Sequence, residues 1–263
     1  MIVDLHNHTP LCNHAEGKLD QYIKSAILNK TKVFGFSDHA PMDFDPAYRM
    51  KFEEMKEYEK DVLNAKEQFK GEIEILLGYE VDYLKGHMDE RVLNANVDYL
   101  IGSVHFLEGW GFDNPEFIGK WEEQDIDEIW QKYFDTIEEM ANTKLFDIVG
   151  HFDLIKVFKF MPKGDIVKMA FNALLAIKAA GMVIELNVAG YRKKVKEPYP
   201  SRELLEVAFT LNIPITFSSD AHKPEQVAMF NDEIVELAKS VGYTKCSYFK
   251  GRKRQEILFS PAS

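Results

Sequence analysis

Residues 1–8 of the chain read MIVDLHNH, in which a short run rich in β-branched and apolar residues, 2–5, is followed at once by two histidines. A run of this kind predicts a β-strand. Side chains at positions i and i+2 of a strand project to the same face, so His6 and His8 are predicted to lie side by side just past the carboxyl end of that strand. The same arrangement recurs along the chain.

Six further runs of this kind follow, and longer segments with helical period separate them. The predicted strands are 2–5, 33–36, 74–78, 99–103, 146–149, 183–186 and 214–217. The predicted helices are 19–29, 52–69, 124–142, 165–179, 202–211 and 225–240. This alternation is typical of repeated βα units around a parallel sheet. At 263 residues the chain is long enough for one such α/β domain, and we expect a single domain over residues 1–263.

Polar side chains of metal-binding types follow six of the seven predicted strands. They are His6, His8, His14, Asp38, His39, Glu80, His105, His151, Asp153, Asp220 and His222. The carboxyl ends of parallel strands are where barrels and open α/β sheets build their sites. Imidazole suits zinc, iron and similar metals, while carboxylates add charge and bridge ions. So many ligands exceed the needs of one ion, and they predict two or three divalent transition metal ions.

Each of these residues alone is weak evidence. A single histidine near a strand end is more often a polar core residue than a ligand, but seven at one end of the strands would be a costly way to fill a core. The eighth histidine, His87, lies in a polar loop and is expected to be solvated. Cys12 is a thiolate ligand or, as we favour, a small buried filler. Asp38 and Asp153 are expected to orient their neighbouring imidazoles.

With these motifs the chain resembles the polymerase-and-histidinol-phosphatase (PHP) superfamily, and within it the monofunctional histidinol-phosphatase branch. The motifs that carry the resemblance are DLHNHTPLCNHAEG (4–17), GFSDHAP (35–41), GYEVDY (78–83), SVHFLEGWGFD (103–113), VGHFDLIK (149–156), ELNVAGYRKKVKEPYPS (185–201) and SSDAH (218–222). A pair of histidines spaced as HxH would be weak on its own. The ordered set is specific and covers nearly the whole chain.

The resemblance implies a distorted seven-stranded (β/α)7 TIM-like barrel, the PHP fold, with a trinuclear metal centre at the carboxyl ends of the strands. It assigns His6, His8, Glu80 and Asp220 to the first ion, Glu80, His105 and His151 to the second, and His14, His39 and His222 to the third. All nine positions hold the residue types that the family uses. The resemblance therefore implies an active enzyme.

The implied reaction is the metal-dependent hydrolysis of a phosphate monoester, L-histidinol phosphate, in histidine biosynthesis. Zinc, iron and manganese all suit these ligands. Metal ions lower the pKa of a bridging water toward ~7, which makes a hydroxide available to attack phosphorus without a covalent phosphoenzyme. Asp220 or His222 is expected to relay a proton to the departing alcohol.

A basic loop after the sixth strand is expected to bind the phosphate. In residues 189–201, AGYRKKVKEPYPS, Arg192 is the predicted phosphate clamp because guanidinium offers bidentate donors, with Lys193 beside it. Lys194 and Lys196 are expected to be solvated.

A second loop, LEGWGFDNPEF at residues 107–117, follows His105. Trp110, Phe112 and Asp113 are predicted to cover an imidazole-bearing substrate and to contact its ammonium group. Glycines 109 and 111 permit the tight turns of such a lid. Packing of the two aromatic rings against the barrel rim is an equally good interpretation.

Composition narrows the class of protein. The formal net charge of -11 disfavours a general nucleic-acid-binding surface. The basic cluster at 252–254 is expected to be a solvated turn tip within a closing hairpin or edge strand at 247–259.

We expect no signal peptide and no membrane-spanning segment. With two cysteines and no disulfide framework, a reducing cytoplasm fits. Oligomeric state is not predicted.

The sequence leaves two alternative functions open. The first is a PHP phosphoesterase acting on another monoester, such as a nucleotide, a DNA end or phosphotyrosine. The second is a non-catalytic metal-binding PHP module. The full ligand set favours the enzyme, and the basic loop 189–201 favours the histidinol-phosphatase branch.

Overall fold

Seven parallel strands form the centre of the molecule in the computed structural model, which describes residues 1–259. They are β1 (Val3–Asp4), β2 (Val33–His39), β3 (Glu74–Asp82), β4 (Tyr99–Ser103), β7 (Ile148–Val149), β8 (Val183–Asn187) and β9 (Ile215–Ser218). Neighbours in the sheet follow chain order, β1-β2-β3-β4-β7-β8-β9. All seven predicted strands are confirmed.

The two edges of this sheet meet and nearly close a barrel. The Leu5 N–H donates to the Phe217 carbonyl at 3.1 Å, and the His8 N–H donates to the Ala221 carbonyl at 2.9 Å. These bonds join the segment after β1 to β9 and to the segment that follows β9. The predicted seven-stranded TIM-like (β/α) barrel is therefore confirmed, and closure brings the first and last histidine motifs together.

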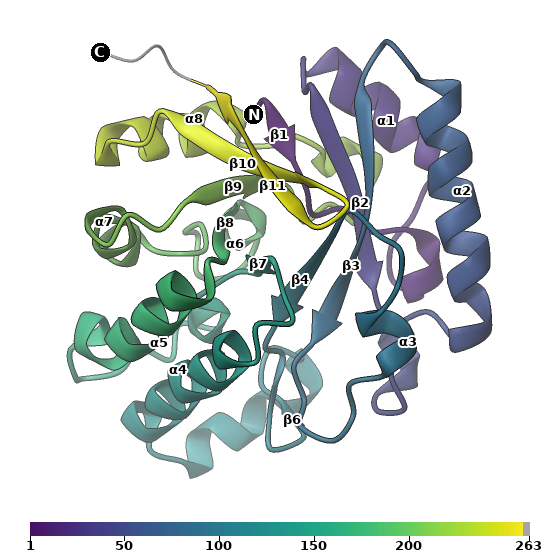
Figure 1. Cartoon of the computed structure of the whole chain (residues 1–263). Helices are drawn as coiled ribbons and strands as arrows, with labels where there is room; N and C mark the ends of the chain where they lie inside the picture. The colour runs from purple at the N-terminus through teal and green to yellow at the C-terminus, as the bar shows by residue number, and fades with distance from the viewer. Residues whose placement is uncertain (260–263) are drawn as a thin grey trace.

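Helices surround the strands, with α1 and α2 on one side and α4, α5 and α7 on the other (Figure 1). They are α1 (Leu19–Leu28), α2 (Met55–Gln68), α3 (Glu90–Leu93), α4 (Ile126–Asn142), α5 (Ile166–Ala180), α6 (Ala189–Arg192), α7 (Arg202–Thr210) and α8 (Asn231–Val241). Within residues 1–259, none of these helices is long and apolar enough to cross a bilayer.

The start of the last predicted helix, 225–240, is wrong. The α-helix begins only at Asn231, because the backbone before it takes left-handed conformations at Ala228 (φ 57°) and Phe230 (φ 59°). The Ala228 N–H donates to the Ser219 hydroxyl at 2.7 Å, which holds this turn against the segment after β9. A hydrogen bond to a side chain nine positions away does not show in the helical periodicity of the sequence.

Both faces of the barrel strands are buried. Along β3, Ile75 and Leu77 belong to the core between strands and helices, whereas Leu76 belongs to a second apolar cluster that also contains Tyr99 and Ile101 of β4. Strands buried on both faces read as continuous apolar runs, which is why the sequence revealed them.

The packing of the Tyr99 side chain requires glycine at two positions of the neighbouring strands. Its hydroxyl donates to the Leu5 carbonyl at 2.6 Å. A Cβ atom at Gly35 would lie 2.1 Å from that hydroxyl, and one at Gly78 would lie 2.6 Å from the ring. The two neighbouring strands therefore need glycine where they pass this ring.

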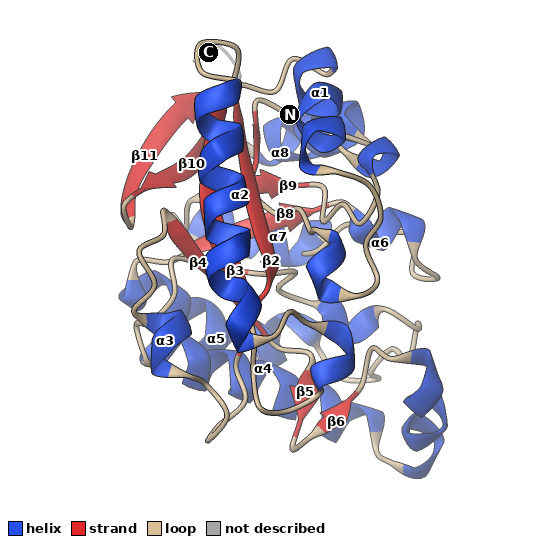
Figure 2. Cartoon of the chain, turned by 90° about the vertical axis from the view of Figure 1, so that its right-hand side faces the viewer, coloured by secondary structure: helices blue, strands red, loops and turns tan. Residues whose placement is uncertain are grey.

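The amino ends of the strands are covered by the predicted closing hairpin, β10 (Lys245–Lys250) and β11 (Lys253–Leu258). Its turn binds the segments that lead into β4 and β7: the Arg252 N–H donates to the Asp98 carbonyl at 2.8 Å, and the Arg252 guanidinium pairs with the Asp147 carboxylate. Arg252 is therefore not the solvated turn residue that we expected. The short hairpin β5 (Phe106–Leu107) and β6 (Trp110–Gly111) lies at the opposite end of the molecule (Figure 2).

Candidate metal centre and active site

Glu80 lies at the centre of a group of imidazoles. Its side chain, near the end of β3, is 1% exposed. Oε2 lies 2.9 Å from His39 Nδ1 and 3.2 Å from His6 Nε2. Oε1 lies 2.9 Å from His151 Nε2. One carboxylate thus faces rings from three other segments, as a ligand that bridges two ions must.

His105 and His151 form a group with Glu80 on one side of the site. The two Nε2 atoms are 3.1 Å apart, and His105 Nε2 lies 3.6 Å from Glu80 Oε1. Two imidazole nitrogens this close either share a proton or face one cation. The three ligand atoms all lie within 4.8 Å of one another.

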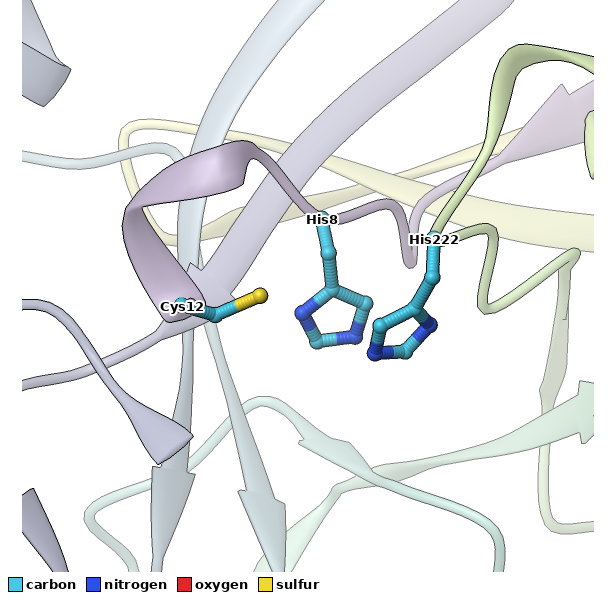
Figure 3. A group of neighbouring side chains, drawn as sticks. All are labelled: His8, Cys12 and His222. Carbon is cyan, nitrogen blue, oxygen red and sulfur yellow. The ribbon is translucent and has the colours of Figure 1, made fainter. Parts of the chain in front are cut away.

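A second group forms on the other side, where His14, His39 and His222 also place their ligand atoms within 4.8 Å of one another. The Nε2 atoms of His14 and His222 are 3.0 Å apart. The His222 ring stacks on the His8 ring with 4.0 Å between centroids (Figure 3). Cys12 points its thiol toward the opposite edge of His8 in the same view and is fully buried.

Asp220 joins these groups from the loop after β9. Its Oδ1 lies 3.2 Å from His8 Nε2, and its Oδ2 accepts from the Asn187 side-chain amide at 3.1 Å. Asp220 and His151 both have positive φ angles, 49° and 24°. Non-glycine residues in this sparsely populated region cluster at functional sites.

Four buried ligand atoms in the centre have no hydrogen-bond partner among the described residues: His6 Nε2, His8 Nε2, His39 Nδ1 and Glu80 Oε2. Leaving such atoms unpaired is costly. His6, His8 and Glu80 also form a compact group of ligand atoms within 4.8 Å. Cations between these atoms would satisfy all four, so the donor set fits a cluster of divalent metals.

The electrostatics of the centre are strongly coupled. Burial alone would lower the pKa of His6, yet the carboxylates of Glu185 and Glu80 hold it well above its ordinary value. Burial lowers the pKa of His39 to about 4. For Glu80, burial would raise the pKa, but the surrounding imidazoles hold it well below its ordinary value. Ionised Glu80 and neutral His39 are in the states that bind metal, whereas His6 would release its proton when a metal binds, because a ligand imidazole must be neutral.

Three carboxylates fix the outward-facing nitrogens of the rings. Glu185 Oε1 lies 2.7 Å from His6 Nδ1, Asp82 Oδ1 lies 2.6 Å from His105 Nδ1, and Asp38 Oδ1 lies 3.2 Å from His8 Nδ1. Acceptors in these positions set the tautomer and orientation of the imidazoles. Asp38 therefore orients His8 and not its chain neighbour His39, whose ring faces Glu80.

Sequence reasoning missed Glu185 and Asp82. Glu185 is fully buried in β8, the one predicted strand to which no ligand was assigned from the sequence. It also accepts from the His151 N–H at 2.7 Å. A carboxylate inside an otherwise apolar strand was the available signal. Asp82 follows Glu80 at i+2, so it projects to the same face of β3.

The expectation that Asp153 orients His151 is wrong. Its Oδ2 lies 2.8 Å from the Lys156 ammonium and accepts from the Ser201 N–H at 2.9 Å. His87 is partly exposed in its loop, and its Nδ1 lies 2.7 Å from Asp43 Oδ1.

A pocket of about 580 Å³ opens over the imidazoles. Arg192, Lys193 and Asp113, three of the residues predicted to bind substrate, line it. Arg192 Nη2 donates to the Ser219 and Asp220 carbonyls at 2.9 and 2.8 Å, while its Nη1 has no partner among residues 1–259. The guanidinium is therefore held in place through Nη2, and Nη1 remains available to bind a ligand.

The structure does not bring Trp110 and Phe112 into this pocket. Phe112 is fully buried and Trp110 is 7% exposed. Both rings pack edge-on against the Trp121 ring. The Phe112 centroid lies 6.5 Å from the Trp121 centroid, and the Trp110 centroid lies 5.2 Å from it. The prediction that these two rings contact substrate is therefore wrong, and they pack in the core, in line with the alternative interpretation. The aromatic side chain that lines the pocket from this loop is Phe117.

A barrel of this topology, with imidazoles and carboxylates gathered at the strand ends, defines the class of metal-dependent α/β-barrel hydrolases. The model of the PHP domain family matches residues 4–189, and the chain belongs to this family.

Similar proteins carry related names. The chain is 37% identical over 260 residues to a probable histidinol-phosphatase of Deinococcus radiodurans, covering 97% of this chain and 98% of that protein. It is 27% identical to the histidinol-phosphatase of Bacillus subtilis, covering 89% and 98%. Histidinol phosphate phosphatase from Lactococcus lactis, solved with zinc, L-histidinol and phosphate, shares the fold with a TM-score of 0.78 at 19% identity, covering 96% and 98%.

Proposed function

We propose that this chain is a histidinol-phosphatase, a phosphoric monoester hydrolase that releases phosphate from L-histidinol phosphate in histidine biosynthesis. The observation that carries the proposal is the end-to-end similarity to a probable histidinol-phosphatase. The gathering of ligand-type side chains around Glu80 under one pocket supports it.

The nine side chains would hold two or three divalent ions, of zinc, iron or manganese. The geometry supports three groups: His6, His8 and Glu80 with Asp220; Glu80, His105 and His151; and His14, His39 and His222. When bound, such ions supply a hydroxide nucleophile near neutral pH and neutralise phosphoryl charge.

The pocket walls would hold the two ends of the substrate. Arg192, with Nη1 free, would donate to phosphoryl oxygens, and Lys193 would add a second positive charge. Asp113 makes no ion pair among the described residues and would face the ammonium or imidazole of the amino alcohol.

Asp220 or His222 would relay a proton to the leaving alkoxide. Burial would raise the pKa of Asp220, but His6, His8 and His222 hold it well below the ordinary value, so this carboxylate is ionised and suited to bind a cation. Burial and the His8 charge hold the pKa of His222 well below its ordinary value, so this ring is neutral and suited to ligate.

The test is phosphate release by the metal-loaded protein from L-histidinol phosphate, measured beside a nucleotide monophosphate and phosphotyrosine. We expect the highest kcat/KM for L-histidinol phosphate. Preference for another ester would move the chain to a different phosphoesterase activity, and no release from any ester would indicate a binding module.

A further inference from the structure

A buried ion pair fastens the loop that carries the basic pocket residues. Lys156 is 1% exposed, and its ammonium lies 2.8 Å from Asp153 Oδ2. The same ammonium donates to the Pro198 carbonyl at 2.8 Å and to Glu197 Oε2 at 3.2 Å. Asp153 Oδ2 also accepts from the Ser201 N–H. The pair therefore holds the far end of the loop 193–201.

The other face of this loop forms a wall of the active-site pocket. Arg192 at the end of α6, Lys193 at the start of the loop and Tyr199 near its end line that pocket. The Tyr199 ring lies between the two faces: its centroid is 5.5 Å from the Lys156 ammonium and 6.4 Å from the His151 ring. One layer of side chains thus separates the ion pair from the site.

Close packing links the fastened end of the loop to Arg192. A Cβ atom at Gly190, in α6, would lie 1.9 Å from the Glu197 carbonyl oxygen, so the loop backbone rests directly on the helix that carries Arg192. The Tyr199 and Asn187 backbones exchange two hydrogen bonds of 2.9 and 2.7 Å. Movement of residue 197 is therefore passed to α6 and to the end of β8.

A gain in stability does not by itself explain why Lys156 and Asp153 form a buried ion pair at this position. Removing two charges from water is costly, and an apolar pair of similar volume is often as stable. An ammonium with three oriented oxygen acceptors instead selects one loop conformation. We propose that Lys156, together with Asp153, is a positioning residue that acts through loop 193–201 to hold Arg192 and Lys193 where the substrate phosphate binds. This inference rests on the proposed function.

The test compares Lys156→Met with Lys168→Met, a matched change at an exposed lysine of α5. In metal-loaded Lys156→Met we expect KM for L-histidinol phosphate and Ki for inorganic phosphate to rise by about tenfold to a hundredfold, since small displacements of positioning groups have effects of this size. We expect kcat and metal content to change far less. Hydrogen exchange should accelerate within residues 193–201, a readout independent of turnover.

A double-mutant cycle separates positioning from general destabilisation. If Lys156 acts through Arg192, its effect on KM should largely disappear in the Arg192→Ala background, because coupled residues are not additive. Should Lys156→Met fold poorly because Asp153 is left alone, Asp153→Asn/Lys156→Met provides a neutral pair, and the same rise in KM is expected.

Unchanged KM and unchanged hydrogen exchange in a folded variant would overturn the inference, as would additive effects in the cycle. Absence of L-histidinol phosphate turnover by the wild-type protein would instead refute the proposed function, so the two failures are distinguishable.

Discussion

At the scale of single residues, the centre is defined by rings whose two nitrogens face different partners. His6 directs Nε2 toward Glu80 and Nδ1 toward Glu185, and His105 directs Nδ1 toward Asp82. His14 places Nδ1 2.8 Å from the Cys12 carbonyl. Each of these acceptors holds one ring nitrogen and leaves the other nitrogen free to bind metal. Glu185, Asp82 and the Cys12 carbonyl should therefore affect metal affinity although they touch no ion.

Replacement of Glu185 tests this point. Glu185→Gln should weaken metal affinity by about 10- to 100-fold, because the His6 ring and the His151 backbone lose an ionised acceptor. Titration of metal-depleted protein with zinc measures the effect, and the exposed Glu203→Gln serves as the control. Wild-type affinity in Glu185→Gln would show that this contact does not orient the ligand.

Arg192 should act on substrate binding. Arg192→Ala should raise KM by about 10- to 100-fold, since a charged hydrogen bond to phosphate contributes about 1.5–3 kcal/mol. Steady-state kinetics with L-histidinol phosphate measure it, beside Lys194→Ala at an exposed position of the same loop. A selective loss of kcat with unchanged KM would assign Arg192 a different role.

At the scale of elements, the β10–β11 hairpin contributes to stability at the end of the barrel away from the chemistry. Arg252 spans the two αβ connections that lead into β4 and β7 by binding Asp98, Asp147 and the Leu145 carbonyl. These contacts fasten the hairpin under β4 and β7. The hairpin therefore bears on the fold and not on the reaction.

Arg252→Ala should lower the free energy of unfolding by about 1–3 kcal/mol, because Asp147 loses its charged partner. KM and kcat below the unfolding temperature should stay at wild-type values. Thermal or urea unfolding measures the change, with the exposed Arg254→Ala as the matched variant. Equal stability of the two variants would argue against this function of the hairpin.

Local patterns predicted the elements well and the loops less well. Strands buried on both faces, such as β4, gave runs that could be recognised residue by residue. The late start of α8 was missed because it depends on a bond from Ala228 to Ser219. The sequence could not decide between a lid and the core for Trp110 and Phe112, because apolar rings suit both equally. Glu185 was missed because its partner lies 179 positions away.

At the scale of the whole molecule, barrel closure assembles the centre. His14 and His222 are separated by 208 positions in the chain, yet their Nε2 atoms are 3.0 Å apart because β1 meets β9. The histidine motifs predicted this meeting once a barrel was inferred, since parallel strands place their carboxyl ends at one rim. Folding and metal binding should therefore be coupled.

Metal removal should reveal this coupling. Treatment with a chelator should abolish phosphate release and lower Tm, because ions that bind only the folded chain stabilise it by mass action. Adding zinc, manganese or iron back should restore both properties. Calorimetry and activity measured on one sample provide the check, and an unchanged Tm after complete removal of metal would contradict the coupling.

The most direct measurement is the metal content of Glu80→Ala beside wild-type protein, determined by elemental analysis and paired with phosphate release from L-histidinol phosphate. The wild-type chain should carry two or three divalent ions and be active. Glu80→Ala should fold, lose at least one ion and lose turnover, because its carboxylate faces rings from both sides of the centre. A Glu80→Ala protein with its full metal complement and wild-type rate would contradict the account.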